Sequence, residues 1–308
     1  MEVIMDFLDL FAGVGGFRLG MEQANHKCVG YVEWDESARR SYEAIHDTEG
    51  EWSWHDISTI DYRDIPKAEC WTFGFPCQDI SLGGKGKGFK GDRSSLFFAV
   101  TKRLRQIKEW DSERMPTYLF IENVKNFLSV NNGWDFLIAQ TELGEIGYDC
   151  EYEILSTRDF QLPQSRERVY IVGHLRERSG PKIFPIERNI TTTPIPRTSG
   201  FQIINNTKQG FDFAGEEDSI NYAFASSNTR RGRVGRGTFQ TLDTQCKQAV
   251  LDNGEWRQIT PKEAWRIQGF PDWAFDKAAA VNTDRQLYKQ AGNGVSINVI
   301  YEIAKRLV

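Results

Sequence analysis

Cys77 is the side chain in this sequence that is best placed to act as a nucleophile. It lies in the stretch GFPCQDIS (74–81), which follows an apolar run. A strand that ends in Gly-Phe-Pro must stop pairing at the proline, so the next side chain is presented at the edge of a sheet, where ligands collect. The alternative is that Cys77 is a small apolar core residue, which is the usual role of a free cysteine.

One carboxylate and two guanidinium groups follow a similar pattern. Glu122 comes directly after the apolar segment 118–121, so we expect it to share the sheet edge with Cys77, with a helix cap as the alternative. Arg166 and Arg168 stand two residues apart at the start of a strand, and alternation along the strand would put them on one face. Two guanidinium groups on one face suit anionic or carbonyl oxygen atoms.

The element that must position a cofactor is the segment DLFAGVGGF (9–17). An apolar run from Met5 to Leu10 precedes the glycines, and apolar residues at helical spacing follow from Phe17, so the pattern predicts strand, glycine turn and helix. Glycines let the backbone pass close to a ligand, and the helix N-terminus offers free amide donors. The spacing is not GxGxxG, which argues against a pyrophosphate group in the cofactor.

Acidic and aromatic residues after the next two apolar segments could bind the rest of a nucleoside. Glu33 lies 20 residues beyond Gly13 (33 minus 13), where dinucleotide folds carry a ribose-binding acid. Trp34 could stack on a base, but packing inside the protein is the simpler expectation. Asp56 could accept a hydrogen bond from an adenine amino group, with surface capping as the alternative.

The composition argues against several other classes of protein. No apolar run approaches the roughly 20 residues of a membrane helix, and the N-terminus lacks a signal-peptide pattern, so we expect a cytoplasmic protein. The five cysteines form no CxxC pair and the four histidines no HExxH motif, so we expect neither a disulfide framework nor a metal centre. The net charge of -5 does not indicate a surface that attracts nucleic acid as a whole.

Positive charge is concentrated in one arginine cluster, which contains Arg230, Arg231, Arg233 and Arg236 and no acidic residue. The cluster could bind phosphate, or it could be a solvated loop. It lies within residues 176–256, where periodicity fades and Asn, Thr, Gly, Arg and Ser prevail, so we expect a second, smaller domain there. Regular structure resumes at the capping sequence TPKE (260–263), and a last helix is expected over about 296–307.

Taken in this order, the segments resemble the DNA cytosine-5 methyltransferase family, of the bacterial or phage type. The resemblance rests on DLFAGVGG (9–16), EWD (33–35), GFPCQ (74–78), ENV (122–124), QSRERVYIVG (164–173), RQITPKEAWRIQGFPD (257–272) and AGNGVSINV (291–299). It implies a doubly wound, Rossmann-like α/β fold with an S-adenosylmethionine-dependent catalytic domain at 1–175. A small, mostly β or irregular target-recognition domain would follow at 176–256, and the chain would return to the catalytic domain with a C-terminal helix at 257–308.

The resemblance also implies methyl transfer to carbon 5 of a flipped-out cytosine in a specific DNA sequence. Cys77 would add to ring carbon 6, because carbon 5 is a poor nucleophile until the ring is activated. Glu122 would hold or protonate ring nitrogen 3, Arg168 would grip the ring carbonyl, and Arg166 would support that site. A base inside a duplex cannot reach a cysteine at a sheet edge, so it must be flipped out, and segment 83–91 would close over it.

The remaining site residues follow from the same resemblance. The cofactor would be S-adenosylmethionine, with S-adenosylhomocysteine as the product. Its expected contacts are Phe11, Gly13, Gly15, Glu33, Trp34, Asp56, Ile57, Pro76, Asn293 and Val295. The expected contacts of the double-stranded DNA are Gln78, Ser81, Arg93, Gln164, Arg230, Arg231, Arg233, Arg236 and Thr241.

Three other functions are open at this point. An RNA-methylating branch of the family shares the catalytic motifs but carries a Cys-Phe-Thr signature, whereas Cys246 is followed here by Lys-Gln. An inactive DNA-binding homologue would be expected to have lost Cys77, Glu122 or Arg168, and all three are present. A nicotinamide dehydrogenase would be expected to carry the third glycine of the GxGxxG motif, which is missing here. We expect a compact monomeric enzyme without a regulatory extension before residue 9, and a cognate restriction endonuclease as a partner that forms no stable complex.

Overall fold

The computed structural model describes residues 4–75, 95–178, 180–188, 197–223 and 233–307, and residue 95 by its backbone alone. The chain forms two compact units. Unit 1 consists of Met1–Leu155, Glu167–Glu187 and Val299–Val308, and unit 2 consists of Ser156–Arg166 and Arg188–Asn298. Residues 257–298 therefore cluster with unit 2, whereas the sequence suggested a return to the catalytic domain at 257. The functional boundaries at 175 and 256 stay a prediction.

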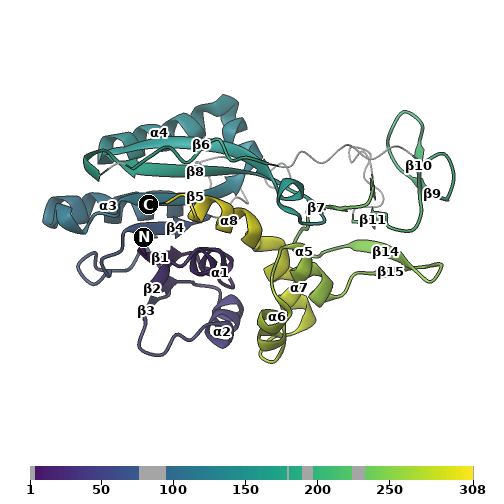
Figure 1. Cartoon of the computed structure of the whole chain (residues 1–308), viewed down its shortest axis with the longest axis horizontal. Coiled ribbons are helices and arrows are strands. Elements are labelled where there is room, and N and C mark those ends of the chain that lie inside the picture. The colour runs from purple at the N-terminus through teal and green to yellow at the C-terminus, as the bar shows by residue number, and fades with distance from the viewer. Residues whose placement is uncertain (1–3, 76–94, 179, 189–196, 224–232, 308) are drawn as a thin grey trace. The chain divides into compact units, whose positions relative to one another are not determined.

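Unit 1 is built on a seven-stranded sheet with the order β3-β2-β1-β4-β5-β8-β6, which Figure 1 shows from β3 at the bottom to β6 at the top. The strands are β1 Asp6–Leu10, β2 Lys27–Val32, β3 Trp52–Trp54, β4 Cys70–Phe73, β5 Tyr118–Val124, β6 Tyr148–Ser156 and β8 Glu167–Leu175. Neighbours from β3 to β5 run parallel, and β8 is antiparallel to β5. The order reverses between β1 and β4, which is where doubly wound sheets bind ligands at the carboxyl ends of their strands.

Helices cover both faces of this sheet. They are α1 Gly16–Gln23, α2 Glu36–Ile45, α3 Ser95–Trp110 and α4 Trp134–Ile146. Leu104 of α3 and Leu143 of α4 share one buried apolar cluster with Leu8 of β1. On the opposite face, Phe17 of α1 packs edge-on against Phe120 of β5, with ring centroids 5.1 Å apart. The predicted doubly wound α/β fold is confirmed.

Unit 2 combines short strands with a group of helices. Its strands are β7 Gln164–Ser165, β9 Phe201–Ile204, β10 Phe211–Ala214, β11 Ser219–Asn221, β12 Val234–Gly235, β13 Phe239–Gln240, β14 Gln248–Asp252 and β15 Glu255–Gln258. They form a four-stranded sheet (β12-β11-β14-β15) and two two-stranded pairs, β9 with β10 and β7 with β13. The helices are α5 Pro261–Ile267, α6 Asp272–Ala279 and α7 Asp284–Asn293, and α8 Ile297–Ala304 leads back into unit 1.

Two local expectations were wrong. Strand β5 continues through Val124, so Glu122 lies inside the strand opposite Tyr170 of β8 and not after its end. The strand expected to begin with Arg166 and Arg168 begins instead at Glu167, because Arg166 lies between β7 and β8. Arg166 and Arg168 therefore do not alternate along one strand, and the argument that they share a face does not hold.

Candidate active site

The glycine turn after β1 has a backbone conformation that residues with side chains rarely adopt. Gly13 and Gly15 have φ angles of 59° and 84°, in the left-handed region that favours glycine. A Cβ atom on Gly15 would lie 2.0 Å from Nε2 of His46, whereas a Cβ atom on Gly13 would meet no described atom within 4 Å. The turn is therefore packed against His46 at one glycine and has space for a ligand at the other.

Glu33, directly after β2, fixes this turn through its carboxylate. The residue is 8% exposed. Its Oε2 accepts the N–H of Gly13 at 2.7 Å, and its Oε1 accepts the N–H of Asp35 at 2.7 Å. Burial raises the pKa of Glu33, and the two N–H donors oppose part of that rise. Each carboxylate oxygen can accept a second hydrogen bond, which suits the two hydroxyls of a ribose.

The neighbours of Glu33 differ in their exposure. Trp34 is 78% exposed, so the expectation that it packs inside the protein was wrong, and its ring can stack on a flat ligand. Asp56 accepts the N–H of Ser58 at 2.8 Å through Oδ1, which is the local capping role considered from the sequence. Ile57 beside it is buried, and Phe11 adopts a φ of 53° at the start of the turn.

Glu122 and Arg168 form an ion pair at the other side of the strand-order reversal. Arg168 Nε lies 3.1 Å from Glu122 Oε1, and the two side chains are 13% and 11% exposed. Within the described residues Glu122 Oε1 has no hydrogen bond of good geometry, so it keeps acceptor capacity. This pair places a carboxylate and a fixed cation together, and the roles that the resemblance implies for the two residues stay a prediction.

The chain that leads toward Cys77 is held against the same strand. A Cβ atom on Gly74 would lie 3.3 Å from Oε2 of Glu122, and the Asn123 side chain donates to the carbonyl of Phe75 at 3.3 Å. Several predicted site residues lie outside the described residues, together with segment 83–91: Pro76, Cys77, Gln78, Ser81, Arg93, Arg230 and Arg231.

Arg166 supports the segment that follows α7 and does not join Arg168. It is 3% exposed and donates to the carbonyls of Gly292 and Gly294 at 3.3 and 3.0 Å. These carbonyls flank Asn293, which is exposed, and Val295 follows as a half-buried residue. Both predicted cofactor contacts thus lie in unit 2, on a segment that Arg166 holds.

Two predicted DNA contacts are interior residues of unit 2. Gln164 is 0% exposed, and its side chain bonds to Gln268 and accepts the N–H of Leu242. Arg233 is 5% exposed and donates to the carbonyls of Asn221 and Ala223. The sequence patterns could not distinguish a surface polar residue from a buried, hydrogen-bonded one, so we no longer place these two residues among the DNA contacts.

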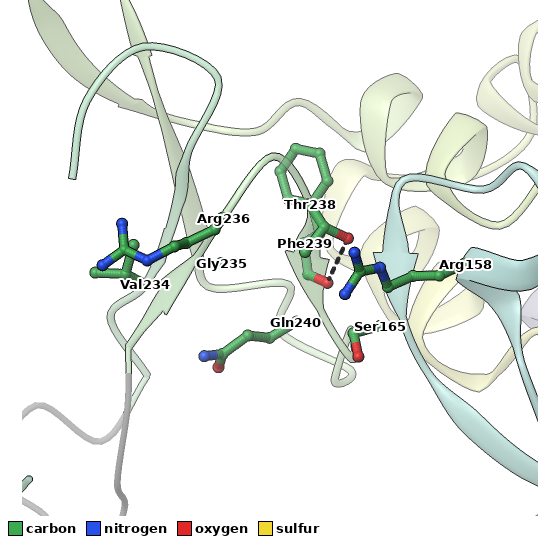
Figure 2. A pocket seen from close by; sticks show the side chains of 8 residues that line it. All are labelled: Arg158, Ser165, Val234, Gly235, Arg236, Thr238, Phe239 and Gln240. Atoms are coloured by element: carbon green, nitrogen blue, oxygen red, sulfur yellow. Dashed lines mark hydrogen bonds between the residues drawn. The ribbon is translucent and has the colours of Figure 1, made fainter. Parts of the chain in front are cut away.

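A hollow of about 370 Å³ lies within unit 2 beside the two remaining described candidates, Arg236 and Thr241. Its lining is Arg158, Ser165, Val234, Gly235, Arg236, Thr238, Phe239 and Gln240 (Figure 2). Arg236 donates to Asp212 and to the carbonyl of Phe213, so its charge is largely neutralised, and Thr241 donates to the carbonyl of Ser165 at 2.9 Å. Figure 2 shows the Arg158 guanidinium directed toward Thr238 and Phe239.

Most of this lining was missed from the sequence. Phe239 and Gln240 of β13 pair in parallel with Gln164 and Ser165 of β7, which are distant in the chain. Such short parallel pairs leave no periodic signal. Arg236, which lines the hollow, and Thr241, which follows Gln240, were the sequence candidates that pointed to this region.

No helix formed by the described residues is long and apolar enough to cross a membrane.

Known proteins resemble this chain over nearly its whole length. The model of the C-5 cytosine-specific DNA methylase family matches residues 5–231 and 186–308. The type II methyltransferase M.HhaI of Haemophilus parahaemolyticus is 31% identical over 320 residues, covering 97% of this chain and 92% of its own. The type II methyltransferase M.SsoII of Shigella sonnei is 34% identical, covering 98% of this chain and 79% of its own.

Solved structures show the same fold at lower identity. The Entamoeba histolytica methyltransferase EhMeth superposes with a TM-score of 0.67 at 22% identity, covering 97% of this chain and 96% of that chain. The Dnmt2 methyltransferase of S. pombe superposes with a TM-score of 0.61 at 20% identity, covering 97% of each chain.

Proposed function

Because the chain belongs to the C-5 cytosine-specific DNA methylase family, we propose that it transfers a methyl group from S-adenosylmethionine to carbon 5 of a cytosine in double-stranded DNA. The observation that carries this proposal is the arrangement of unit 1. The glycine turn held by Glu33 at the end of β1 and the Glu122–Arg168 pair on β5 and β8 lie on opposite sides of the strand-order reversal.

The residues of the glycine turn fit this cofactor. Glu33 has acceptor capacity for a ribose, the exposed Trp34 ring can stack on adenine, and the turn leaves space at Gly13. The cofactor supplies an electrophilic sulfonium methyl group. The residues that we propose as its contacts are Phe11, Gly13, Gly15, Glu33, Trp34, Asp56, Ile57, Pro76, Asn293 and Val295.

The chemistry assigned to the protein is activation of the cytosine ring. The Cys77 thiolate adds to carbon 6, and the electron pair of the 5,6 double bond moves to carbon 5. Glu122 holds or protonates ring nitrogen 3, and Arg168 binds the ring carbonyl oxygen, so the charge that addition creates is stabilised. Carbon 5 would take the methyl group as the bond from that group to the cofactor sulfur breaks, which leaves S-adenosylhomocysteine. Carbon 5 then loses its proton to an unassigned base, and the Cys77 bond breaks to restore the ring.

The DNA contacts of unit 2 are proposed around the hollow beside β13. Arg158 and Gln240 combine a guanidinium and an amide, which are the groups that bind guanine and adenine edges in a major groove. The target cytosine would be flipped out of the duplex at a cost of a few kcal/mol. The relatives of this chain are named type II methyltransferases, so a cognate restriction endonuclease is the proposed functional partner. We propose that the methyltransferase itself acts as a monomer.

The test is transfer of labelled methyl from S-adenosylmethionine to unmethylated DNA and, in parallel, to total tRNA. Labelled DNA with one methylated motif after bisulfite sequencing is the expected result. Label in tRNA alone would move the chain to RNA methylation, and label in neither would contradict the proposed activity. Cys77→Ser should abolish transfer and leave the affinity for S-adenosylhomocysteine within about twofold, because the thiolate acts on the base.

A further inference from the structure

Asp9 is a buried carboxyl group that joins the two strands beside the strand-order reversal. It lies on β1, two residues before Phe11, and is 0% exposed. In the sheet it stands opposite Thr72 of β4, which lies two residues before Gly74. Asp9 therefore connects the strand that ends in the glycine turn to the strand that leads toward the nucleophile segment.

The Thr72 hydroxyl can donate to Asp9 or to the carbonyl of Leu8, and both contacts can be full hydrogen bonds at once if Asp9 donates a hydrogen. Thr72 Oγ1 lies 3.0 Å from Asp9 Oδ1 and 3.4 Å from the carbonyl of Leu8. A carbonyl can only accept, and a hydroxyl has one hydrogen to give. If Asp9 is protonated, it donates to Thr72 and Thr72 donates to Leu8, so both contacts become hydrogen bonds in one chain.

The nearby cation has no hydrogen bond left for Asp9. Arg18 Nε donates to Glu22, Nη1 donates to Glu51 and Tyr42, and Nη2 donates to Glu51 and the carbonyl of Asp47. These are the five N–H groups of a guanidinium. Asp9 Oδ2 has no hydrogen-bond partner among the described residues, so an ionised Asp9 would be a poorly compensated buried charge.

The other titratable groups near Asp9 do not favour its charge either. Glu22 of α1 and Glu33 after β2 are acids, and Cys28 of β2 and Tyr42 of α2 are neutral or negative. Burial raises the pKa of Asp9 to about 8, and Thr72 and Arg18 oppose part of that rise. Geometry and electrostatics thus agree on an uncharged carboxyl group.

We propose that Asp9 is a positioning residue that works as a neutral carboxylic acid, tying the strand of the cofactor turn to β4 through Thr72. Loss of its proton breaks the hydrogen-bond chain and places a buried charge on β1, two residues before the turn begins at Phe11. The turn then loses the backbone conformation that binds the ligand. The inference rests on the proposed function for the identity of the cofactor.

The first test is the calorimetric affinity for S-adenosylhomocysteine as a function of pH. If only the protonated form binds, the dissociation constant of the unmodified protein rises about tenfold from about pH 7 to about pH 9. Asp9→Asn keeps a neutral group of the same shape, so its affinity should vary much less over that range. Asp6→Asn makes the same substitution on the same strand and should keep the unmodified profile.

The outcomes separate this inference from the proposed function. Absence of binding at every pH would contradict the proposed cofactor, whereas good binding with the same pH profile in the unmodified protein and Asp9→Asn would overturn the role of Asp9. If Asp9→Asn does not fold, ¹³C NMR of aspartate carboxyls in the unmodified protein still decides. One carboxyl should titrate near pH 8, and titration of all of them below about pH 6 would overturn the inference.

Discussion

The Glu33 carboxylate accepts two backbone N–H groups, one from each side of the cofactor turn region, Gly13 and Asp35. We therefore expect cofactor affinity to be sensitive to replacement of Glu33 by glutamine. In Glu33→Gln an amide NH₂ group must face either the Gly13 or the Asp35 N–H, so one of the two bonds is lost. Hydrogen bonds to charged groups contribute about 1.5–3 kcal/mol, so affinity for S-adenosylhomocysteine should fall about 10- to 100-fold by calorimetry. Glu36→Gln, on the exposed start of α2, is the control and should bind normally.

The Glu33 carboxylate should also determine how the affinity for the cofactor falls at low pH. Burial raises the pKa of Glu33 above its ordinary value of 4.5, and the ionised form is the one that accepts the Gly13 and Asp35 N–H groups. Affinity should therefore be complete above the raised pKa and fall as the pH drops through it, at a higher pH than for an exposed glutamate. An acid limb that persists unchanged in Glu33→Gln would assign it to another group.

Arg168 should matter for the chemical step and little for the cofactor. Arg168→Ala leaves Glu122 without its ion-pair partner and removes the donor proposed for the ring carbonyl. Loss of one such donor costs about 100- to 1000-fold in kcat, whereas the affinity for S-adenosylhomocysteine should stay within about threefold. The control is Glu167, the residue before Arg168. Glu167→Ala breaks the exposed ion pair with Lys125 and should change kcat by less than about threefold.

At the scale of elements, the start of α1 offers a matched pair of substitutions. Gly13→Ala introduces only the cost of a left-handed backbone, about 1–2 kcal/mol of unfolding free energy. Gly15→Ala has the same cost and also forces a methyl group against the His46 ring. Urea unfolding without cofactor should therefore show a clearly larger loss for Gly15→Ala. Equal losses would mean that the His46 contact is not part of the turn.

The elements that could be predicted from the sequence are those defined by neighbouring residues. Apolar runs bounded by glycines were enough to predict β1, the turn and α1, and the capping sequence at Thr260 predicted the start of α5. The extent of β5 beyond Glu122 depends on its pairing with β8, and the burial of Gln164 depends on helix α5 and the segment after it. These partners are distant in the chain, and one sequence carries no signal for them.

At the scale of the whole molecule, the net charge of -5 means that the proposed DNA binding must depend on local positive charge. Arg158 lines the hollow of unit 2, whereas Arg233 is buried and bonded to two carbonyls. Arg158→Ala should lower DNA affinity and reduce the slope of log affinity against log salt concentration by about one. Fluorescence anisotropy over a series of salt concentrations measures both quantities.

Arg233→Ala should act through stability instead. It leaves the carbonyls of Asn221 and Ala223 without this donor inside unit 2, at a cost of about 1–3 kcal/mol for each unsatisfied group. Calorimetry should show a lower melting temperature, while the folded variant should keep the salt dependence of the unmodified protein. If Arg233→Ala reduces the salt slope and Arg158→Ala does not, the buried arginine must become exposed on DNA, and the hollow beside β13 is not where unit 2 meets the phosphates.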